Sequence, residues 1–272
     1  MQQTRIAIIG AGNIGSSIAN GLAESELFAP QDIILTRRRI HLLDEQKKRG
    51  FIIEKDNLTA VRQSEVVIIA VEPLQTDHVL EEISPALLPE KHTLISIVTG
   101  ISTHQIKEKI SKEIPIVRAM PNTAIAVRQS MTCIASASTN GKAIEMAKTI
   151  FSTGGQTLVI HEEQMDAATA LVACGIAFFF RAIRAASQGG IEIGFHADEA
   201  LEMAAQTAKG AASLLLFSGN HPESEIDKVT TPRGCTIAGL NRMEHEGFSS
   251  ALIKGITVSA EKASKLYTKE SG

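Results

Sequence analysis

Two patterns of apolar residues follow one another along the chain. Up to about residue 160, short apolar runs alternate with polar, helix-like stretches, and beyond it apolar residues recur with a period of 3.6. The first six runs predict buried parallel strands, at 5–9, 33–36, 51–53, 66–71, 93–97 and 115–120. Two further strands, at 131–135 and 157–160, are expected to complete the sheet. Their alternation with helices predicts a doubly wound α/β sheet.

The second pattern predicts helices only. Five are expected, at 164–188, 198–217, 222–228, 236–246 and 248–267. The fold class is therefore α/β, with an N-terminal Rossmann-type doubly wound sheet at 1–161 followed by an all-α domain at 162–272.

The first of these helices is apolar on nearly all sides, through Leu171, Val172, Ile176 and its phenylalanines. A lone cluster of five helices cannot comfortably bury such a helix, so we expect helices of a second subunit to cover it. Its uncharged window, 167–180, is shorter than the roughly 20 residues that a bilayer requires. It predicts a buried helix and no membrane partner.

A glycine-rich turn joins the first strand to the first helix. It has the pattern G-x-G-x-x-G and runs through Gly10, Gly12, Asn13, Ile14 and Gly15. The glycines allow a tight turn, close approach of the backbone to a pyrophosphate, and close helix–strand contact. The helix N-terminus that follows favours bound phosphate. We therefore expect the first domain to bind a dinucleotide.

The residues at the end of the second strand indicate which dinucleotide. Thr36 is followed by Arg37, Arg38 and Arg39, where a site specific for NAD would place an acidic residue near the ribose hydroxyls. A guanidinium can bind the 2′-phosphate of NADP, so NADPH is the expected cofactor, with NADH as an allowed alternative. The competing interpretation is a solvated basic helix start, which is favoured for Arg39 and for one of the other two.

Composition and charge set wider limits. With a net charge of −3 and 44% apolar residues, the chain is an ordinary globular protein for which no nucleic-acid partner is expected. The cysteines at 133, 174 and 235 are few and widely spaced, which argues against a disulfide framework or a metal site and indicates a reducing compartment. We find no pattern of a signal peptide, so the cytoplasm fits best.

Residues 229–240, in the helical half, form an unusual sequence that is suited to binding an anion. In the sequence VTTPRGCTIAGL at 229–240, Thr231 and Thr236 offer hydroxyls and Gly234 allows close backbone approach. The helix that begins near Thr236 would supply free amides for a small carboxylate. The alternative is that a threonine here is an ordinary N-cap and that the Pro-Arg-Gly turn only joins two helices.

This string resembles the C-terminal motif of the pyrroline-5-carboxylate reductase family. The resemblance extends over nearly the whole chain, through the glycine turn, the basic end of the second strand, and segments 70–73, 96–100, 118–123 and 221–223. The family reduces 1-pyrroline-5-carboxylate to proline with NADPH or NADH, the last step of proline synthesis. The resemblance also implies a homodimer with interleaved helical domains and the substrate at its interface.

The resemblance implies roles for individual residues. Residues 10–15 and Arg37 would bind the dinucleotide, with Arg38 and Thr36 beside them, and further cofactor contacts would come from Asn57, Ala70, Val71, Pro73, Met120, Pro121 and Asn122. The substrate carboxylate would bind at Thr231, Gly234, Cys235 and Thr236. The hydroxyl of Thr236 would face the ring nitrogen as the catalytic group. A protonated cyclic imine is itself an electrophile, so alignment matters more than acid–base chemistry.

Departures from the family pattern keep two alternatives open. Glu72 stands where the family commonly has Lys, Val172–Ile176 replaces a Ser-Gly-Ser-Gly-Pro string, and Arg233 replaces a glycine. A non-catalytic NADPH-binding redox sensor, or a reductase of a related cyclic imine, would also fit. A β-hydroxyacid dehydrogenase of this architecture needs a lysine on the first C-terminal helix, where only Arg181 and Arg184 are basic.

Overall fold

The structure, a computed structural model, describes residues 4–137 and 141–266. These residues divide into two compact units, one of 4–137, 141–174 and 259–266 and the other of 175–258. The sequence placed the functional boundary after residue 161. The two divisions differ by segment 162–174, which is helical, and by residues 259–266, both of which belong to the compact unit that holds the sheet.

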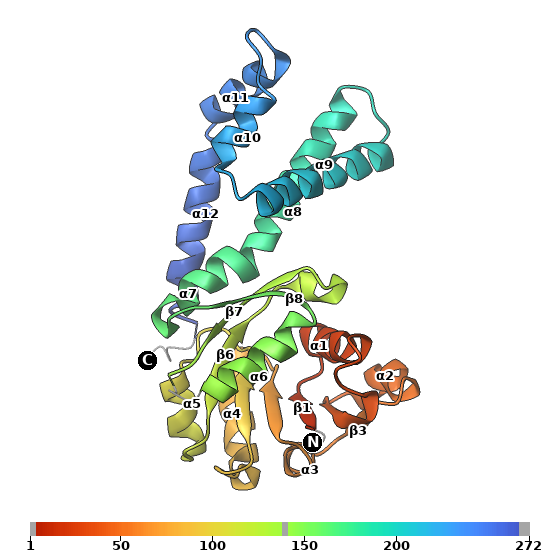
Figure 1. The fold of residues 1–272 in the computed structure, drawn as a ribbon, viewed down its shortest axis with the longest axis vertical. Coiled ribbons are helices and arrows are strands. Elements are labelled where there is room, and N and C mark those ends of the chain that lie inside the picture. The colour runs from red at the N-terminus through yellow and green to blue at the C-terminus, as the bar shows by residue number, and fades with distance from the viewer. Residues whose placement is uncertain (1–3, 138–140, 267–272) are drawn as a thin grey trace. The chain divides into compact units, whose positions relative to one another are not determined.

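Within the described residues, eight strands form one sheet in the order β3-β2-β1-β4-β5-β6-β7-β8 (Figure 1). The strands are β1 (Ile6–Ile9), β2 (Ile33–Thr36), β3 (Ile52–Glu54), β4 (Val66–Ile69), β5 (Thr93–Ser96), β6 (Ile116–Met120), β7 (Ser130–Ala135) and β8 (Gly155–Val159). All neighbours are parallel except β6 and β7. Only residues 121–129 join these two strands, too few for the crossover that a parallel pair needs. The Rossmann-type doubly wound sheet is confirmed.

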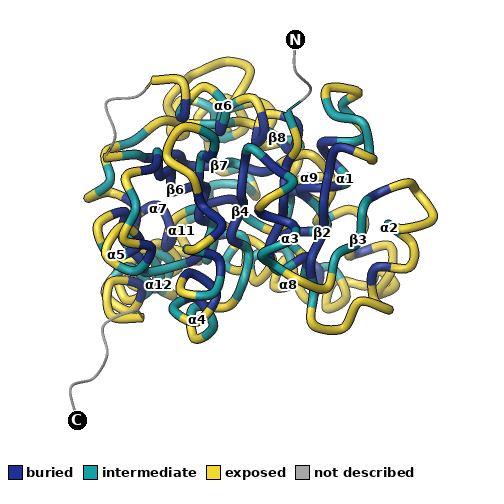
Figure 2. The backbone as a smooth tube through the Cα atoms, turned by 90° about the horizontal axis from the view of Figure 1, so that it is seen from below, coloured by how far each residue is buried: buried dark blue, intermediate teal, exposed yellow. Residues whose placement is uncertain are grey.

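Helices cover both faces of this sheet, because alternate strand residues point to opposite sides. Ile6 and Ile8 of β1 share a core with α1 and α6, whereas Ala7 and Ile9 share the other core with α3, α4 and α5. The bounds are α1 (Asn13–Glu24), α2 (Asp44–Lys48), α3 (Asn57–Arg62), α4 (Pro73–Ile83), α5 (Thr103–Ile110) and α6 (Gly141–Ser152). Figure 2 shows β2 and β4 in the colour of buried residues, and β1 is buried along its whole length.

The second unit is helical, as predicted. Its helices are α8 (Gly175–Glu192), α9 (Ala197–Ser218), α10 (Pro222–Lys228), α11 (Cys235–His245) and α12 (Phe248–Ala263), the last of which runs on into the first unit. The predicted end of the last helix at residue 267 lies outside the described residues. Ahead of α8, the chain forms α7 (Met165–Ala168) and a π-helical segment, Thr169–Cys174, so that one helical run leads from the sheet into α8.

This first C-terminal helix is not buried by the rest of its own chain. Leu171, Phe179 and Phe180 are 57%, 61% and 60% exposed. The helical run Glu162–Glu192 reaches a mean hydropathy of 1.6 in an 18-residue window of which 22% is buried, so by length and composition it could cross a membrane. The strongest packing of α8 is against α9, and the burial of this helix by a second subunit stays a prediction.

His92 is a buried histidine that connects a loop to the sheet layer. It is 2% exposed and directly precedes β5. Its Nδ1 accepts a hydrogen bond from the Leu88 amide at 2.8 Å, and its Nε2 lies 3.0 Å from the carbonyl oxygen of Val61. These partners require a neutral ring that carries its proton on Nε2, and burial lowers the pKa of His92.

We predict that this histidine makes stability fall in mild acid. Its folded-state pKa lies below the unfolded value of 6.5, so its contribution is complete above 6.5 and declines as the pH drops toward the folded pKa. His92→Gln should cost about 1 kcal/mol at neutral pH and flatten the dependence of Tm on pH between about 7 and 5. His104→Gln, which changes an exposed histidine on α5, should keep the wild-type slope. Equal slopes in all three proteins would contradict the assignment.

Candidate functional site

A cavity of about 960 Å³ lies at the carboxyl ends of β1, β2 and β4. The chain order of the strands reverses here, because β1 lies between β2 and β4, and doubly wound sheets bind their ligands at this point. The predicted cofactor residues that line the cavity are Gly10, Gly12, Thr36, Arg37, Arg38, Asn57, Ala70 and Val71. The structure therefore brings together residues from three separate strand ends.

The glycine turn is held tightly between its neighbouring strands. The amides of Gly10 and Ala11 donate to the carbonyl oxygen of Thr36 at 3.2 and 2.8 Å. Gly10 has a φ of +92°, and a Cβ there would lie 2.7 Å from Val71 Cγ1. A Cβ on Gly15 would lie 2.8 Å from the Gly10 carbonyl oxygen. Both positions therefore require glycine for the close approaches that the sequence predicted.

The helix that follows the turn presents a free N-terminus. Gly12 occupies the N-cap position of α1 without a side-chain cap, and the first turn of α1 contains no acidic residue. Asn13, Ile14 and Gly15 form that first turn rather than the cavity wall. Unpaired amides and the helix dipole at this end favour a bound phosphate.

Positive charge gathers at one edge of the cavity. Arg37 is half-buried, whereas Arg38 and Arg39 are exposed, and all three line the cavity with Lys55. Arg39 is solvent-exposed, as the sequence favoured, and yet borders the same space. Lys55 was missed by the sequence analysis. It follows β3, whose Glu54 pairs with Thr36 of β2, and this register brings it to the same edge. The end of the third predicted strand was the signal that could have identified it.

Two carboxylates also face the cavity, Glu72 and Glu82. Glu82 accepts a hydrogen bond from Asn57 Nδ2 at 2.9 Å, while Asn57 Oδ1 accepts one from the Thr36 hydroxyl at 2.7 Å. This chain of bonds fixes the Asn57 amide at the start of α3. Glu72 is exposed at the N-cap position of α4, before Pro73, where it places negative charge beside the cavity in the position that Lys commonly takes in the resembling family.

The residues after β6 lie outside this cavity, as Pro73 does. Met120 is 3% exposed and shares a small apolar cluster with Met165 and Ala168. Asn122 donates from Nδ2 to the carbonyl oxygen of Val172 at 3.4 Å, and its Oδ1 accepts from the Ala124 amide. Met120–Asn122 is thus joined to the π-helical segment. Its placement at the carboxyl end of β6, on the same sheet edge as the cavity, agrees with the predicted loop positions.

The predicted anion-binding loop in the second unit leads into a helix, α11, whose N-terminus has no side-chain cap. α11 begins at Cys235, and its N-cap is Gly234, which has no side chain to cap it. Thr236 is therefore not the N-cap, contrary to the alternative that the sequence left open. A Cβ at Gly234 would lie 2.5 Å from Thr231 Oγ1 and 3.0 Å from the Thr231 carbonyl oxygen, so the turn leaves little room for a side chain. With no acidic residue in the first turn of α11, its free amides can receive a carboxylate.

Arg233 adopts a backbone conformation that favours glycine. Its φ is +59°, in the left-handed region. The family pattern has glycine at this position, so the departure adds backbone strain but leaves the amides of α11 in place. The side chain of Arg233 is exposed.

Comparison with known proteins identifies relatives of both parts of the chain. Residues 162–266 match the family model "Pyrroline-5-carboxylate reductase dimerisation", and residues 5–100 match "NADP oxidoreductase coenzyme F420-dependent". Pyrroline-5-carboxylate reductase 2 of Dictyostelium discoideum is 49% identical over 96% of this chain and 92% of its own. Pyrroline-5-carboxylate reductase 1 of the same organism is 52% identical over 97% of this chain, which spans half of that relative's length.

The solved structures agree with the sequence relatives. The pyrroline-5-carboxylate reductase of Coxiella burnetii superimposes with a TM-score of 0.91 at 29% identity, covering 98% of this chain and 100% of the other. Both the sheet and the helical region are included in this match. The comparison therefore supports the whole succession of folds and not the first domain alone.

We predict that the cationic edge of the cavity sets cofactor preference. NADPH should be preferred over NADH by about tenfold to a hundredfold in kcat/KM, roughly 1.4–2.7 kcal/mol, because solvent screens the arginine–phosphate contacts. Arg37→Ala should remove most of this preference. Lys48→Ala, which removes an exposed cation on α2, should retain it. Equal use of both cofactors by the wild type would show that Arg37 and Arg38 do not bind the 2′-phosphate.

Proposed function

We propose, since the chain belongs to the pyrroline-5-carboxylate reductase family, that it reduces 1-pyrroline-5-carboxylate to L-proline with NAD(P)H and that the residues described above perform this reaction. The observation that carries the assignment of residues is the uncapped N-terminus of α11 behind Gly234. It supplies an anion-binding position in the helical half of a chain whose other half has the glycine turn and cationic cavity of a dinucleotide site.

The substrate is bound through its carboxylate. The amides in the first turn of α11, which include those of Cys235 and Thr236, have no partners within the helix. They donate to the carboxylate, and the Thr231 hydroxyl lies against the same turn. Two fixed amides and a hydroxyl orient a planar ring through its one charged substituent.

Reduction of the C=N bond requires a hydride on the ring carbon and a proton on the ring nitrogen. When bound, the reduced nicotinamide supplies the hydride to the ring carbon of the protonated imine. The Thr236 hydroxyl bonds to the ring nitrogen, whose charge changes from iminium to amine as the C–H bond forms. Met120–Asn122, at the carboxyl end of β6, would lie beside the nicotinamide. This chemistry requires alignment rather than a strong acid.

The departures from the family pattern weaken contacts without removing the site. Glu72 adds negative charge beside the cofactor cavity, which lowers affinity for a phosphorylated ligand, while Arg37, Arg38 and Lys55 remain at its edge. Arg233 strains the turn before α11 and leaves Gly234 in place. Turnover separates this proposal from a redox sensor that binds NADPH without reaction, and a comparison of cyclic imines separates it from a reductase of a related ring.

Oxidation of NADPH in the presence of 1-pyrroline-5-carboxylate tests the proposal, and Thr236→Val tests the catalytic hydroxyl. The substitution keeps the β-branched shape, so the fold and NADPH binding should survive. We expect a loss of about 2–4 kcal/mol in kcat/KM. Thr230→Val is the matched control, because that hydroxyl bonds to the Ile226 carbonyl within the preceding helix. If Thr236→Val reacts within about twofold of wild type, below the tenfold change of about 1.4 kcal/mol, water serves the nitrogen instead.

The functional unit is a dimer, in agreement with the dimerisation family at 162–266. We propose that the helical domains of two subunits interleave. The exposed sides of α8 would then be covered by a second subunit and not by a membrane. The same contact would leave the enzyme soluble, and we expect it in the cytoplasm. Apolar burial is the driving force, because exposed phenylalanines on α8 contribute about 1.5–3 kcal/mol each once covered.

We predict a dimer or larger assembly in detergent-free buffer at micromolar concentration by light scattering. Phe179→Asp should weaken the dimer at least about tenfold, since a charge would enter the covered face. Leu27→Asp is the matched control, because Leu27 and Phe179 are both 61% exposed but lie on different units. A stable, active monomer, or a wild type that requires detergent to leave the membrane fraction, would contradict the proposal.

A further inference from the structure

Arg118 is a charged side chain within the core of the first unit. It lies in the middle of β6 and is 5% exposed. Its Nη1 is 3.5 Å from Glu162 Oε1, whereas its Nη2 is buried and has no hydrogen-bond partner among the described residues. Burial lowers the pKa of Arg118, and the carboxylates of Glu162 and Asp166 oppose that shift. A guanidinium at this position needs its carboxylate partner.

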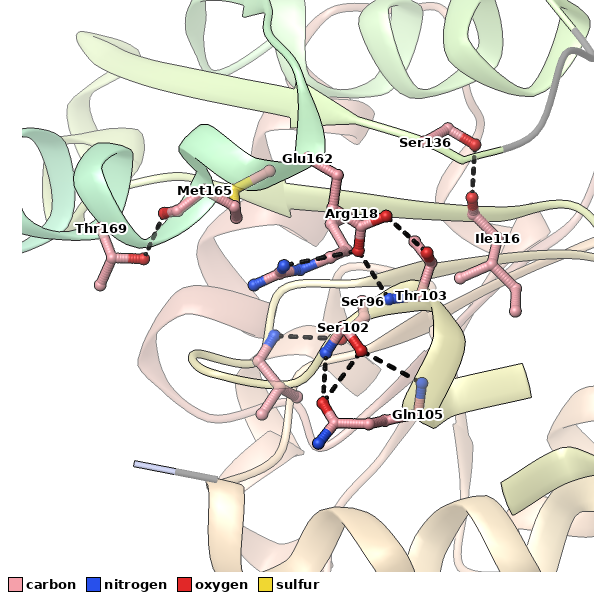
Figure 3. Close-up of polar contacts among 11 residues, drawn as sticks. Ser96, Ser102, Thr103, Gln105, Ile116, Arg118, Ser136, Glu162, Met165 and Thr169 are labelled. Atoms are coloured by element: carbon pink, nitrogen blue, oxygen red, sulfur yellow. Dashed lines mark hydrogen bonds and ion pairs between the residues drawn. The ribbon is translucent and has the colours of Figure 1, made fainter. Parts of the chain in front are cut away.

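Glu162 is held from two directions. Besides Arg118, its carboxylate accepts hydrogen bonds from the Thr103 amide at 2.7 Å and from the Thr103 hydroxyl at 2.5 Å, at the N-terminus of α5 (Figure 3). Ser102 and Gln105 form a separate capping box at the same helix end. The carboxylate thus joins β6, α5 and the start of segment 162–174 at one point.

Alternate residues of β6 and the turn after it make successive contacts with that segment. Arg118 pairs with Glu162, Met120 shares an apolar cluster with Met165, and Asn122 donates to the Val172 carbonyl oxygen. All three contacts lie within the first unit. The exit of β6 and segment 162–174 therefore run along one another, and the ion pair is the only charged link among the three.

An ion pair between a buried arginine and a half-buried glutamate contributes little net stability. Desolvation of both ions offsets their attraction, and apolar residues of similar volume often stabilise a core equally well. Directional contacts do provide geometry, because a carboxylate with three donors has few alternative positions. The segment that it fixes continues without a break through the π-helical turn into α8.

We infer that Arg118 and Glu162 are positioning residues for hydride transfer, which hold Met120–Asn122 and segment 162–174 in one fixed arrangement. The inference rests on the proposed function, in which Met120–Asn122 borders the nicotinamide. A displacement of about 1 Å at the reacting atoms can cost about a hundredfold in rate. The cofactor cavity at β1, β2 and β4 is lined by none of these residues, so most of the contacts that set dinucleotide affinity should be unaffected by the pair.

The test uses the whole chain in its assembled form and compares four single variants and one double variant with wild type. Arg118→Met removes the charge, Arg118→Lys retains it without the planar fork, and Glu162→Gln retains an acceptor for Thr103 without the charge. Lys109→Met is the control, because it breaks the partly exposed ion pairs that Lys109 of α5 forms with Asp77 and Glu81 of α4. The readouts are kcat at saturating NADPH and 1-pyrroline-5-carboxylate, NADPH Kd, Tm, and the isotope effect on kcat with NADPH deuterated at the transferred position.

We expect kcat of Arg118→Met to fall at least about tenfold, with an increased isotope effect and NADPH Kd within about twofold of wild type. Arg118→Lys should recover a substantial part of the rate, and Lys109→Met should match wild type. The double variant Arg118→Met/Glu162→Gln should be no slower than Arg118→Met, since the pair acts as a unit. A purely structural role would lower Tm without changing the isotope effect.

Other results overturn the inference. These are a kcat of Arg118→Met near that of wild type, a loss of NADPH affinity parallel to the loss of kcat, or no recovery in Arg118→Lys. If Arg118→Met does not fold, Glu162→Gln decides through the same readouts. A wild type without turnover overturns the proposed function and this inference with it, whereas normal wild-type turnover with unaffected variants overturns the inference alone.

Discussion

The closeness of three backbones at Gly10 is the constraint on which the first unit depends. Gly10 and Ala11 donate to the end of β2, while Ala70 and Val71 after β4 leave no room for a Cβ at Gly10. A side chain at this point would separate the strands where their order reverses. The cavity, the free N-terminus of α1 and the cationic edge all follow from strand ends that are held at this distance.

Charge in the cofactor cavity is divided rather than uniform. Cations from the ends of β2 and β3 face carboxylates from α4, and Glu82 is engaged by Asn57. Such an arrangement limits non-specific attraction of anions and leaves discrimination to the few groups that can reach a 2′-phosphate. Because Glu72 lines the cavity beside these groups, we expect it to change the strength of cofactor binding more than the place where the cofactor binds.

In the helical half, a single chain does not bury its own apolar surface. Its first helix begins against the sheet and is joined there by the Arg118–Glu162 pair and the Met120–Met165 contact. Beyond the π-helical segment, Phe179 and Phe180 of this helix are exposed. We expect a second copy to cover such a helix in water, which would link the assembly of the dimer to the unit that we propose binds the substrate carboxylate.

Local patterns in the sequence determined the strands, the glycine turn, the run Arg37–Arg39 and the helix start behind Gly234, because each depends on neighbouring residues. Only the tertiary structure decided that Lys55 and Glu82 share a cavity with Arg37 and that Arg118 meets Glu162. These partners are far apart along the chain, and strand order brings them together. The exposure of α8 was likewise not local, since burial depends on how many helices surround an apolar one.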